Sequence, residues 1–544
     1  MFQSIKSDLF LTLLCLTLIL TGCKGEAYAS GVLGSQPAQI TAVSAAPIEF
    51  IDGVALITKG GRYRISGEHT GQILINATRS DEVEIILDGV ILNNPAGQAI
   101  FAPRSKSVEL ILADGTVNYI SDGIHSDTEN NAAIFVQHDL VISGNGTLNV
   151  TGNFHHGIRA QDFLVISGGT INITAAGDAL RGRDGVIIQD GEFNLIAGGD
   201  GIQSNNDSNP DYGFITINGG TFNISAGDDG MQAETSITIY NGSLTIKAAD
   251  DGITTGGSVL IAGGYINITE SYEGIEGLNV TITGGIVNVY ARDDGINARD
   301  SELTGMNNMR GGWQMMRGPA NQNMYVRITG GIINIHALRD GIDSNNNIFL
   351  EGGSLSISGQ SMGMEGAIDL DGVFLLTGGE LITAGSVMNV SGQSTQPILY
   401  VTFNQQLPAG TSIDIRDENE KILLSYTALM AFRVSAFTSP EFKIGKTYSL
   451  YVNDQKASDA ALGSIITSLG GSNNYMGGGR GNMGGGISPG DFERGSRGNP
   501  GSLPELPNPQ DFRVFPGTPV PGTPVPEMLP PGNYGRSTDR MPRL

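Results

Sequence analysis

The segment ITGGIINIHALRDGID, residues Ile328–Asp343, contains the unit from which most of this chain is built. Similar copies occur at Ile217–Met231, Ile239–Ile253, Ile261–Ile275 and Ile282–Ile296. The acid of an Asp/Glu-Gly-apolar step recurs in these copies at intervals of 22, 22 and 21 residues, by subtraction between Asp229, Asp251, Glu273 and Asp294. A period of this length indicates a solenoid in which each repeat forms one coil.

Short Val/Ile/Thr runs separated by glycines, without helical spacing of the apolar residues, predict β-strands. We therefore predict an all-β fold whose main domain is a right-handed, single-stranded parallel β-helix. An apolar–polar–apolar triplet follows each turn, and period-2 alternation places its central Asn outside the coil. Stacked coils align these side chains in one file: Asn172, Asn194, Asn223, Asn267, Asn288 and Asn334.

The composition narrows the possible partners. The 544 residues include 79 glycines and carry a formal net charge of −24. A phosphate backbone requires a basic surface, so we expect no nucleic-acid partner. The acidity has two explanations, solvated repulsion on an exported protein or a set of sites for divalent cations.

The N-terminal segment predicts export. Lys6 precedes the apolar run Leu9–Leu20, which is typical of a signal peptide and short for a membrane span. Residues 20–23, Leu-Thr-Gly-Cys, resemble a bacterial lipobox, which implies cleavage before Cys23 and lipidation of its thiol. We expect a monomeric lipoprotein on the extracellular side of the cell membrane, or a secreted protein. Cys15 and Cys23 are the only cysteines, so we expect neither a disulfide framework nor a cysteine zinc site.

The domain prediction follows changes in pattern along the chain. A lipoprotein-type signal peptide (1–22) precedes a linker (23–45), a β-helix (46–396), a small module of antiparallel strands (397–455) and a disordered Gly/Pro-rich tail (470–544). The insertion Ser301–Asn323 carries Trp313, the only tryptophan, and insertions of this kind form loops on the binding face of many solenoids.

The recurring acids are the strongest candidates for a functional site. Coils of a β-helix stack about 4.8 Å apart, so equivalent acids form a file. Three of these acids follow a second acid, at Asp228, Asp250 and Asp293. Two carboxylates about 5 Å apart at an effective dielectric near 20 repel by roughly 3 kcal/mol. Raised pKa values, the neighbouring Arg292 and Arg339, or a divalent cation would relieve this repulsion.

Ca²⁺ suits a rigid array of hard carboxylate oxygens best. The competing interpretation is that an Asp at a coil corner caps backbone N–H groups. The predicted Ca²⁺ ligands are Asp228, Asp229, Asp250, Asp251, Glu273, Asp293, Asp294, Asp340 and Asp343.

Several segments together resemble a known family. Asp81–Asn94, Gly97–Ile100, Leu112–Thr116 and the repeated Asp-Asp-Gly-Ile coils are similar to the secreted β-helix carbohydrate-binding proteins first described from a cellulolytic bacterium. The resemblance covers about residues 45–455. It implies a right-handed β-helix with bound calcium that binds cellulose and acidic sugars such as polygalacturonate, with a fold and calcium arrangement similar to those of β-helical pectate lyases.

The resemblance carries the calcium role to the acids that match the family pattern: Asp228, Asp229, Asp250, Asp251, Asp293, Asp294 and Asp340. Two corners depart from the pattern. Glu273 follows Tyr272 instead of an acid, and the corner at residues 361–363 lacks its Asp. A metal ion is therefore less expected at those two corners.

Three functions remain open: a calcium-dependent binder of plant-type polysaccharide, a pectate-type lyase, and an adhesin or spacer. β-Elimination requires a base beside a cation, and Lys247 is the candidate base because it is the only lysine in the regular repeats. Lys247 is equally a candidate contact for sugar carboxylates or a neutralising charge. The predicted sugar contacts are Lys247, Tyr290, Trp313, Asn267 and Asn288. We predict a binder that does not cleave its ligand.

Overall fold

The computed structural model describes residues 45–124, 128–300, 323–360 and 366–470. All regular elements in these ranges are β-strands, and none of the described residues forms a helix that could cross a membrane. The described residues belong to one compact unit, Ala45–Leu544. The predicted signal peptide, Cys23, Trp313 and the Gly/Pro-rich segment from residue 471 onward lie outside the described residues.

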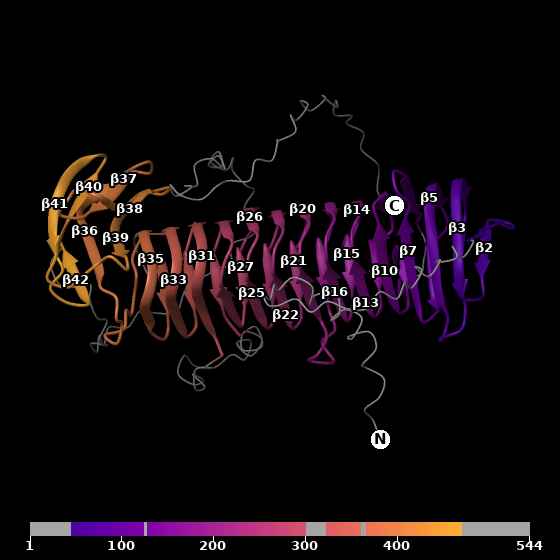
Figure 1. Ribbon diagram of the computed structural model, residues 1–544, viewed down its shortest axis with the longest axis horizontal. Helices are drawn as coiled ribbons and strands as arrows, with labels where there is room; N and C mark the ends of the chain where they lie inside the picture. Colours follow the sequence, from indigo (N-terminus) through magenta and orange to yellow (C-terminus); the bar gives the residue numbers. More distant parts are fainter. Residues whose placement is uncertain (1–44, 125–127, 301–322, 361–365, 471–544) are drawn as a thin grey trace, which may run out of the picture. The chain divides into compact units, whose positions relative to one another are not determined.

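Most coils contain three strands, one on each of three faces. In one coil, β21 (Met231–Ala233), β22 (Ser236–Ile239) and β23 (Ser243–Ala248) follow one another, and the chain then enters the next coil at β24 (Ile253–Thr255). Met231 pairs in parallel with Ile253, and the second and third strands pair in parallel with their equivalents one coil later. Successive coils therefore stack in register, as Figure 1 shows, and the predicted parallel β-helix is confirmed.

The first face is a 13-stranded parallel sheet. In stacking order it consists of β2 (Val54–Ile57), β4 (Gln72–Asn76), β6 (Ile100–Arg104), β9 (Ala132–Val136), β12 (His156–Ala160), β15 (Leu180–Gly182), β18 (Ile202–Ser204), β21, β24, β27 (Ile275–Gly277), β30 (Ile296–Ala298), β32 (Ile342–Ser344) and β34 (Ile368–Leu370). We call it the 13-stranded sheet.

The other two faces belong to one larger sheet. The second face contains β7 (Ser107–Leu112), β10 (Asp139–Gly144), β13 (Phe163–Ile166), β16 (Gly185–Ile188), β19 (Phe214–Ile217), β22, β25 (Ser258–Ile261) and β28 (Asn279–Ile282). The third face contains β8 (Val117–Asp122), β11 (Thr147–Gly152), β14 (Thr170–Ala175), β17 (Glu192–Ala197), β20 (Thr221–Ala226), β23, β26 (Tyr265–Glu270) and β29 (Ile286–Ala291). Five longer strands run through both faces: β3 (Gly61–Thr70), β5 (Glu82–Asn94), β31 (Tyr325–Ala337), β33 (Asn347–Ser358) and β35 (Phe374–Ala384). The two-residue strand β1 (Ala46–Pro47) pairs with β3.

Antiparallel strands follow the last coil. β39 (Phe432–Thr438) pairs with both β35 and β36 (Ile398–Leu407), and β42 (Ile466–Leu469) pairs with β36. A separate four-stranded sheet contains β37 (Ser412–Arg416), β38 (Ile422–Thr427), β40 (Thr447–Val452) and β41 (Gln455–Ala461). Apolar residues of these strands form a second core together with Ile382 and Ala384 of β35. The pairing of β39 with β35 continues the larger sheet beyond the last coil.

The apolar core fills the inside of the coils. In β23, Leu244 and Ile246 point inward and are buried, whereas Ser243 and Lys247 point outward and are exposed. Phe193 and Phe222 stack inside adjacent coils with ring centroids 4.5 Å apart. Alternation along each strand therefore assigns every second side chain to the outer surface, where the polar files lie.

The glycine of the Asp-Gly step is required because the next coil packs directly against it. A Cβ added at Gly252 would lie 2.6 Å from the carbonyl oxygen of Gly274 and 2.8 Å from Cγ2 of Ile268. The glycine that follows each corner acid therefore lets adjacent coils approach closely enough to hold the acids in register.

We predict that Gly252→Ala lowers the free energy of unfolding by about 1–3 kcal/mol, because the added methyl group overpacks the corner. Urea unfolding followed by circular dichroism measures this change. Gly392→Ala is the matched control, because nothing lies within 4 Å of a Cβ at that position. Equal stability of the two variants would contradict the packing explanation.

Candidate functional site

A file of acids runs along the corner between the third face and the 13-stranded sheet. Each acid directly precedes the glycine or alanine that leads into the next strand of that sheet. The members are Asp178, Asp200, Asp229, Asp251, Glu273, Asp294 and Asp340. We call this file the acid ladder. Asp178 and Asp200 were not among the predicted ligands; both follow a glycine, and Asp178 also precedes Ala179 instead of a glycine.

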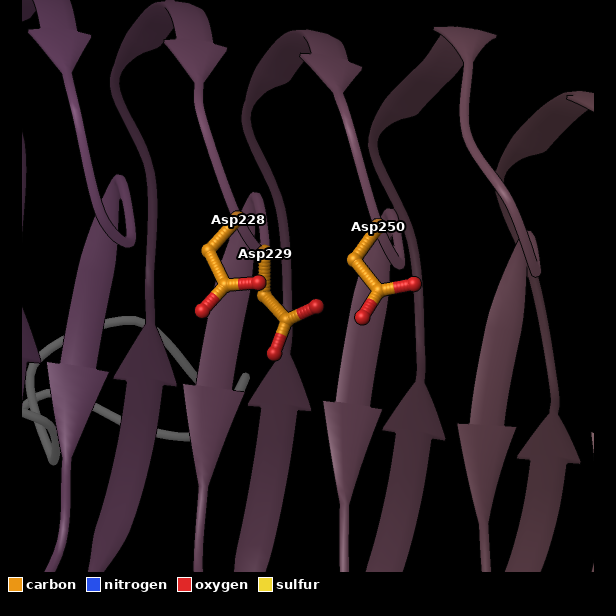
Figure 2. A group of neighbouring side chains, drawn as sticks. All are labelled: Asp228, Asp229 and Asp250. Atoms are coloured by element: carbon orange, nitrogen blue, oxygen red, sulfur yellow. The ribbon is translucent and has the colours of Figure 1, made fainter. Parts of the chain in front are cut away.

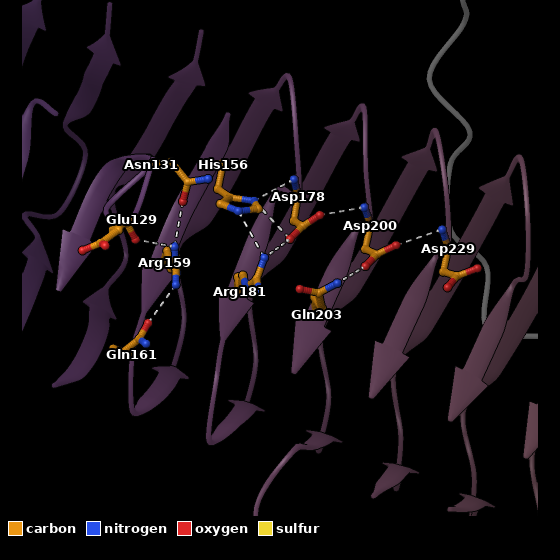
Figure 3. A network of polar contacts seen from close by, with 10 residues as sticks. All are labelled: Glu129, Asn131, His156, Arg159, Gln161, Asp178, Arg181, Asp200, Gln203 and Asp229. Carbon is orange, nitrogen blue, oxygen red and sulfur yellow. Dashed lines mark hydrogen bonds and ion pairs between the residues drawn. The ribbon is translucent and has the colours of Figure 1, made fainter. Parts of the chain in front are cut away.

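Backbone hydrogen bonds connect most members of the acid ladder. The backbone N–H of Asp229 donates to Oδ1 of Asp200 at 3.0 Å, and that of Asp251 donates to Oδ1 of Asp229 at 2.9 Å. Equivalent bonds join Asp178 to Asp200, Asp251 to Glu273, and Asp294 to Asp340, at 3.0–3.1 Å. Figure 3 shows the first part of this series. The predicted capping of backbone N–H groups therefore occurs, and it uses one oxygen of each of the five carboxylates that accept these bonds.

Capping does not remove the electrostatic cost of the acid ladder. Burial raises the pKa of Asp229 to about 8 and that of Asp251 to about 7, although both accept a backbone N–H. Burial and the charge of Asp178 raise the pKa of Asp200 to about 6. The native state therefore retains protons on these acids at pH values where an unfolded chain has lost them.

Three carboxylates converge at the outer edge of the acid ladder. One oxygen from each of Asp228, Asp229 and Asp250 lies within 4.8 Å of the others (Figure 2). Asp228 and Asp250 come from adjacent coils and are exposed. Within the described part of the chain, neither of these two side chains takes part in an ion pair. Burial and the charge of Asp228 raise the pKa of Asp250. We call this group the outer cluster.

A second group of carboxylates is buried and is paired with an arginine side chain. Carboxylate oxygens of Asp251, Glu273 and Glu276 lie within 4.8 Å of one another, and all three residues are buried. Arg299 pairs with Glu276 at 2.6 Å and with Glu273 at 3.7 Å. Asn297 donates to Glu273 at 3.0 Å. Burial and the neighbouring Glu276 raise the pKa of Glu273 well above its usual range. We call this group the inner cluster.

The remaining predicted ligands lie on the coils beyond these clusters. Asp293 pairs with Arg339 at 3.1 Å, and a hydrogen bond to Asp293 raises the pKa of Tyr272 to about 12. Asp294 and Asp340 belong to the acid ladder. Asp343 lies on the 13-stranded sheet beside Asp369, where burial raises its pKa to about 7.

A groove of about 280 Å³ is lined by residues of both the outer and the inner cluster. Its lining includes Asp229, Asp250, Asp251, Gln232, Glu276 and Arg299. The groove therefore crosses adjacent coils beside the 13-stranded sheet and is lined almost entirely by polar side chains.

A second polar file lies on the outer surface of the 13-stranded sheet, at the centre of each short strand. In stacking order it reads Arg159, Arg181, Gln203, Gln232, Thr254, Glu276, Asn297, Asp343 and Asp369. We call it the sheet file. It changes from basic through uncharged to acidic residues. Since no residue type repeats regularly, the sequence did not predict this file, and Asp343 is its one member among the predicted ligands.

The described residues among the predicted sugar contacts lie on the third face and not in the groove. Asn267, Asn288 and Tyr290 point outward from the third face but are only 8%, 3% and 5% exposed. The Asn side chains partly bond to one another, as Asn194 does to Asn172 at 2.8 Å. Lys247 is exposed on the third face and pairs with Glu270 at 2.9 Å. Trp313 lies outside the described residues, so its role stays a prediction, as do the roles of the other four.

We predict that the metal-free protein loses stability as the pH rises from 5 to 9. Asp229 has a native pKa of about 8, whereas an unfolded Asp has the model value of 3.8. Its contribution to stability is complete below about pH 4 and is lost as the pH rises through 8, because the unfolded state then binds fewer protons than the native state. Melting temperatures in EDTA across this range measure the effect.

Asp229→Asn is the matched variant, because its amide oxygen can still accept the backbone N–H of Asp251 and carries no charge at any pH. We expect a smaller decline with pH in this variant. A wild-type melting temperature that stays constant or increases from pH 5 to 9 would contradict the assignment.

We predict that Arg299→Gln lowers the free energy of unfolding by about 2 kcal/mol in EDTA at pH 8. This is less than the roughly 3–5 kcal/mol expected for breaking a fully buried ion pair, because Arg299 is partly exposed. The variant leaves Glu273 and Glu276 without their cation. Arg62→Gln is the control, since Arg62 and Glu84 form an exposed pair. Denaturant titration measures both, and an effect of Arg299→Gln no larger than that of the control argues against the inner-cluster assignment.

Comparison with known proteins identifies the family. Residues 52–316 and 250–398 match the profile of the carbohydrate-binding domain-containing proteins. A protein of that description from Acetivibrio thermocellus is 35% identical over 193 residues, which cover 32% of this chain and 66% of the relative. This chain thus spans slightly less than two thirds of that relative.

One solved structure is also similar, that of the polysaccharide lyase-like protein from C. thermocellum, as a gadolinium derivative. It is 32% identical with a TM-score of 0.36, and the match covers 39% of this chain and 92% of that one. The two profile matches together span residues 52–398, more than half of the 544-residue chain, and include the acid ladder and the groove. The chain therefore belongs to the family of carbohydrate-binding domain-containing proteins.

Proposed function

We propose that this chain is an exported protein that binds plant-type polysaccharide, cellulose or polygalacturonate, in the groove beside the 13-stranded sheet, with Ca²⁺ at the outer cluster. Family membership supports carbohydrate binding in general. The unpaired carboxylates of Asp228 and Asp250 carry the calcium part of the proposal, because they lie together with Asp229 at the edge of the groove.

The donor set fits calcium. Ca²⁺ takes about six to eight oxygen ligands, so carboxylates from the protein can be completed by water or ligand oxygens. Asp228, Asp229 and Asp250 would hold the ion, and one oxygen of Asp229 is already oriented by the N–H of Asp251. When bound, the ion would offset two of the three negative charges and offer its open coordination positions to carboxylate oxygens of a sugar chain.

The position of Lys247 favours binding over cleavage. Its ammonium group is 2.9 Å from Glu270 on the third face, and Lys247 is absent from the groove lining. A base for β-elimination has to reach a proton of the bound sugar. We therefore propose a protein that holds its ligand without cutting it. Export and lipidation at Cys23 belong to the same proposal and rest on the sequence alone.

We predict that the double variant Asp228→Asn/Asp250→Asn weakens Ca²⁺ binding by at least about tenfold, because it removes two of the three charges that hold the ion. Isothermal titration calorimetry with CaCl₂ measures this. Co-sedimentation with insoluble cellulose and with pectate, with and without EDTA, measures retention of the protein on each glycan.

Asp211→Asn is the control, because Asp211 is an exposed acid in the insertion between β18 and β19. Undiminished Ca²⁺ binding in the double variant, or retention on neither glycan in the presence of Ca²⁺, would refute the proposed function.

A further inference from the structure

An exposed aromatic side chain lies beside the acid ladder, and the proposed calcium site makes no use of it. Three tyrosines are exposed in the described ranges: Tyr119 by 51%, Tyr240 by 53% and Tyr272 by 45%. Tyr119 belongs to β8 on the third face, and Tyr240 lies in the turn between β22 and β23. Tyr272 directly precedes Glu273 of the acid ladder. Of the three, Tyr272 alone adjoins the acid ladder.

Backbone hydrogen bonds place Tyr272 in line with the outer cluster. The N–H of Asp250 donates to the carbonyl oxygen of Asp228 at 3.1 Å, and the N–H of Tyr272 donates to that of Asp250 at 2.6 Å. The N–H of Asp293 in turn donates to the carbonyl oxygen of Tyr272 at 2.8 Å. Each of these bonds joins one coil to the next. Tyr272 therefore occupies, one coil after Asp250, the position that Asp228 and Asp250 hold in their own coils.

The groove crosses the coil that carries Tyr272. Its lining includes Glu276, which follows Tyr272 in the same coil, and Arg299 from the next coil. Tyr272 itself is outside the lining and follows the lining residue Asp250 along the corner. One sugar residue in an extended chain is similar in length to the spacing of two coils. A sugar chain in the groove that has one carboxylate at the outer cluster therefore brings its next residue to the coil of Tyr272.

The contacts of Tyr272 restrict the phenol and leave its ring without a stacking partner. A hydrogen bond to Asp293, together with burial, raises the pKa of Tyr272 to about 12, and Asp293 is paired with Arg339 at 3.1 Å. No aromatic ring or guanidinium packs against Tyr272 in the part of the chain that the structure describes. Restricting a side chain in advance reduces the conformational entropy that binding a ligand would cost.

The alternative explanation is that Tyr272 is a neutral spacer. An acid at this position would lie between Asp250 and Asp293 and would repel both, and any uncharged residue avoids that repulsion. Gly199 is such a residue, since it holds the equivalent position one coil before Asp228. A spacer requires no ring, however, and leaving a large apolar surface in contact with water is unfavourable. The exposed ring beside the groove is therefore better explained by contact with a ligand.

We propose that Tyr272 binds the sugar residue next to the calcium-bound one, by packing its aromatic ring against the C–H face of the sugar ring. This inference rests on the proposed function and adds a binding residue that recognises the shape of a sugar and not its charge. An aromatic ring suits this role because it offers a large apolar area whose face carries partial negative charge, and the C–H groups of a sugar carry partial positive charge. Salt does not screen a contact of this kind, in contrast to the attraction between exposed charges.

The test compares the full chain with the variants Tyr272→Asn and Tyr272→Phe by affinity electrophoresis in gels containing polygalacturonate and Ca²⁺. We expect Tyr272→Asn to raise the dissociation constant about five- to tenfold, the loss typical of removing an aromatic anchor. Tyr272→Phe should bind nearly as well as the wild type, because it keeps the ring. The ratio between wild type and Tyr272→Asn should persist when NaCl is added. Calorimetry with CaCl₂ alone should show Ca²⁺ affinity changed less than about twofold, because the ring supplies none of the carboxylates of the outer cluster.

Tyr240→Asn is the matched control, because Tyr240 is similarly exposed but lies at a different corner, and it should bind as the wild type does. Melting temperatures identify variants that fail to fold, and Tyr272→Leu, which also lacks the ring, replaces Tyr272→Asn if that variant is one of them. Calcium-dependent retardation that is equal in the wild type and the ring-less variant overturns this inference and leaves the proposed function standing. A loss in Tyr272→Phe as large as in the ring-less variant also overturns it, because the hydroxyl and not the ring would then be responsible. Absence of wild-type retardation with Ca²⁺ overturns both.

Discussion

The hydrogen bond from the backbone N–H of one corner acid to the carboxylate of the preceding one is the interaction on which the site depends. It joins Asp200, Asp229 and Asp251 across three coils at 2.9–3.0 Å. The bond orients each carboxylate and fixes the register between coils. It also places like charges one coil apart, so the same feature that orders the corner creates the electrostatic cost that the surrounding residues have to offset.

The chain offsets that cost in different ways along the acid ladder. His156 replaces an acid at the start, and its hydrogen bond keeps the pKa of Asp178 low although burial raises it. Arg299 neutralises the inner cluster, and Arg339 neutralises Asp293. Asp228 and Asp250 of the outer cluster form no ion pair among the described residues, although the charges of Arg292 and Arg299 partly oppose the rise in the pKa of Asp250. We therefore propose the outer cluster, and not the inner one, as the Ca²⁺ site.

The fold was predictable because it depends on a repeated pattern. The 22-residue period, the alternation of Ile and Asn, and the Asp-Gly step each recur in register, so stacking could be inferred without coordinates. Much of the site does not repeat. Glu276 and Arg299 belong to no motif and meet Glu273 only because their coils align. Arg159 and Arg181 are likewise grouped by strand register alone.

The burial of the Asn file could not be predicted for a related reason. Alternation shows which side chains leave the coil, but it does not show which outer surfaces are covered. Asn223 is exposed whereas Asn288 is buried, although both occupy the same position in the repeat.

A crystal structure with Ca²⁺, with anomalous scattering recorded, locates the ion independently of any binding assay. We expect an anomalous peak between the carboxylates of Asp228, Asp229 and Asp250, with the Arg299–Glu276 pair intact. An ion seated among Asp251, Glu273 and Glu276 with Arg299 displaced, or no ion at millimolar calcium, would contradict it.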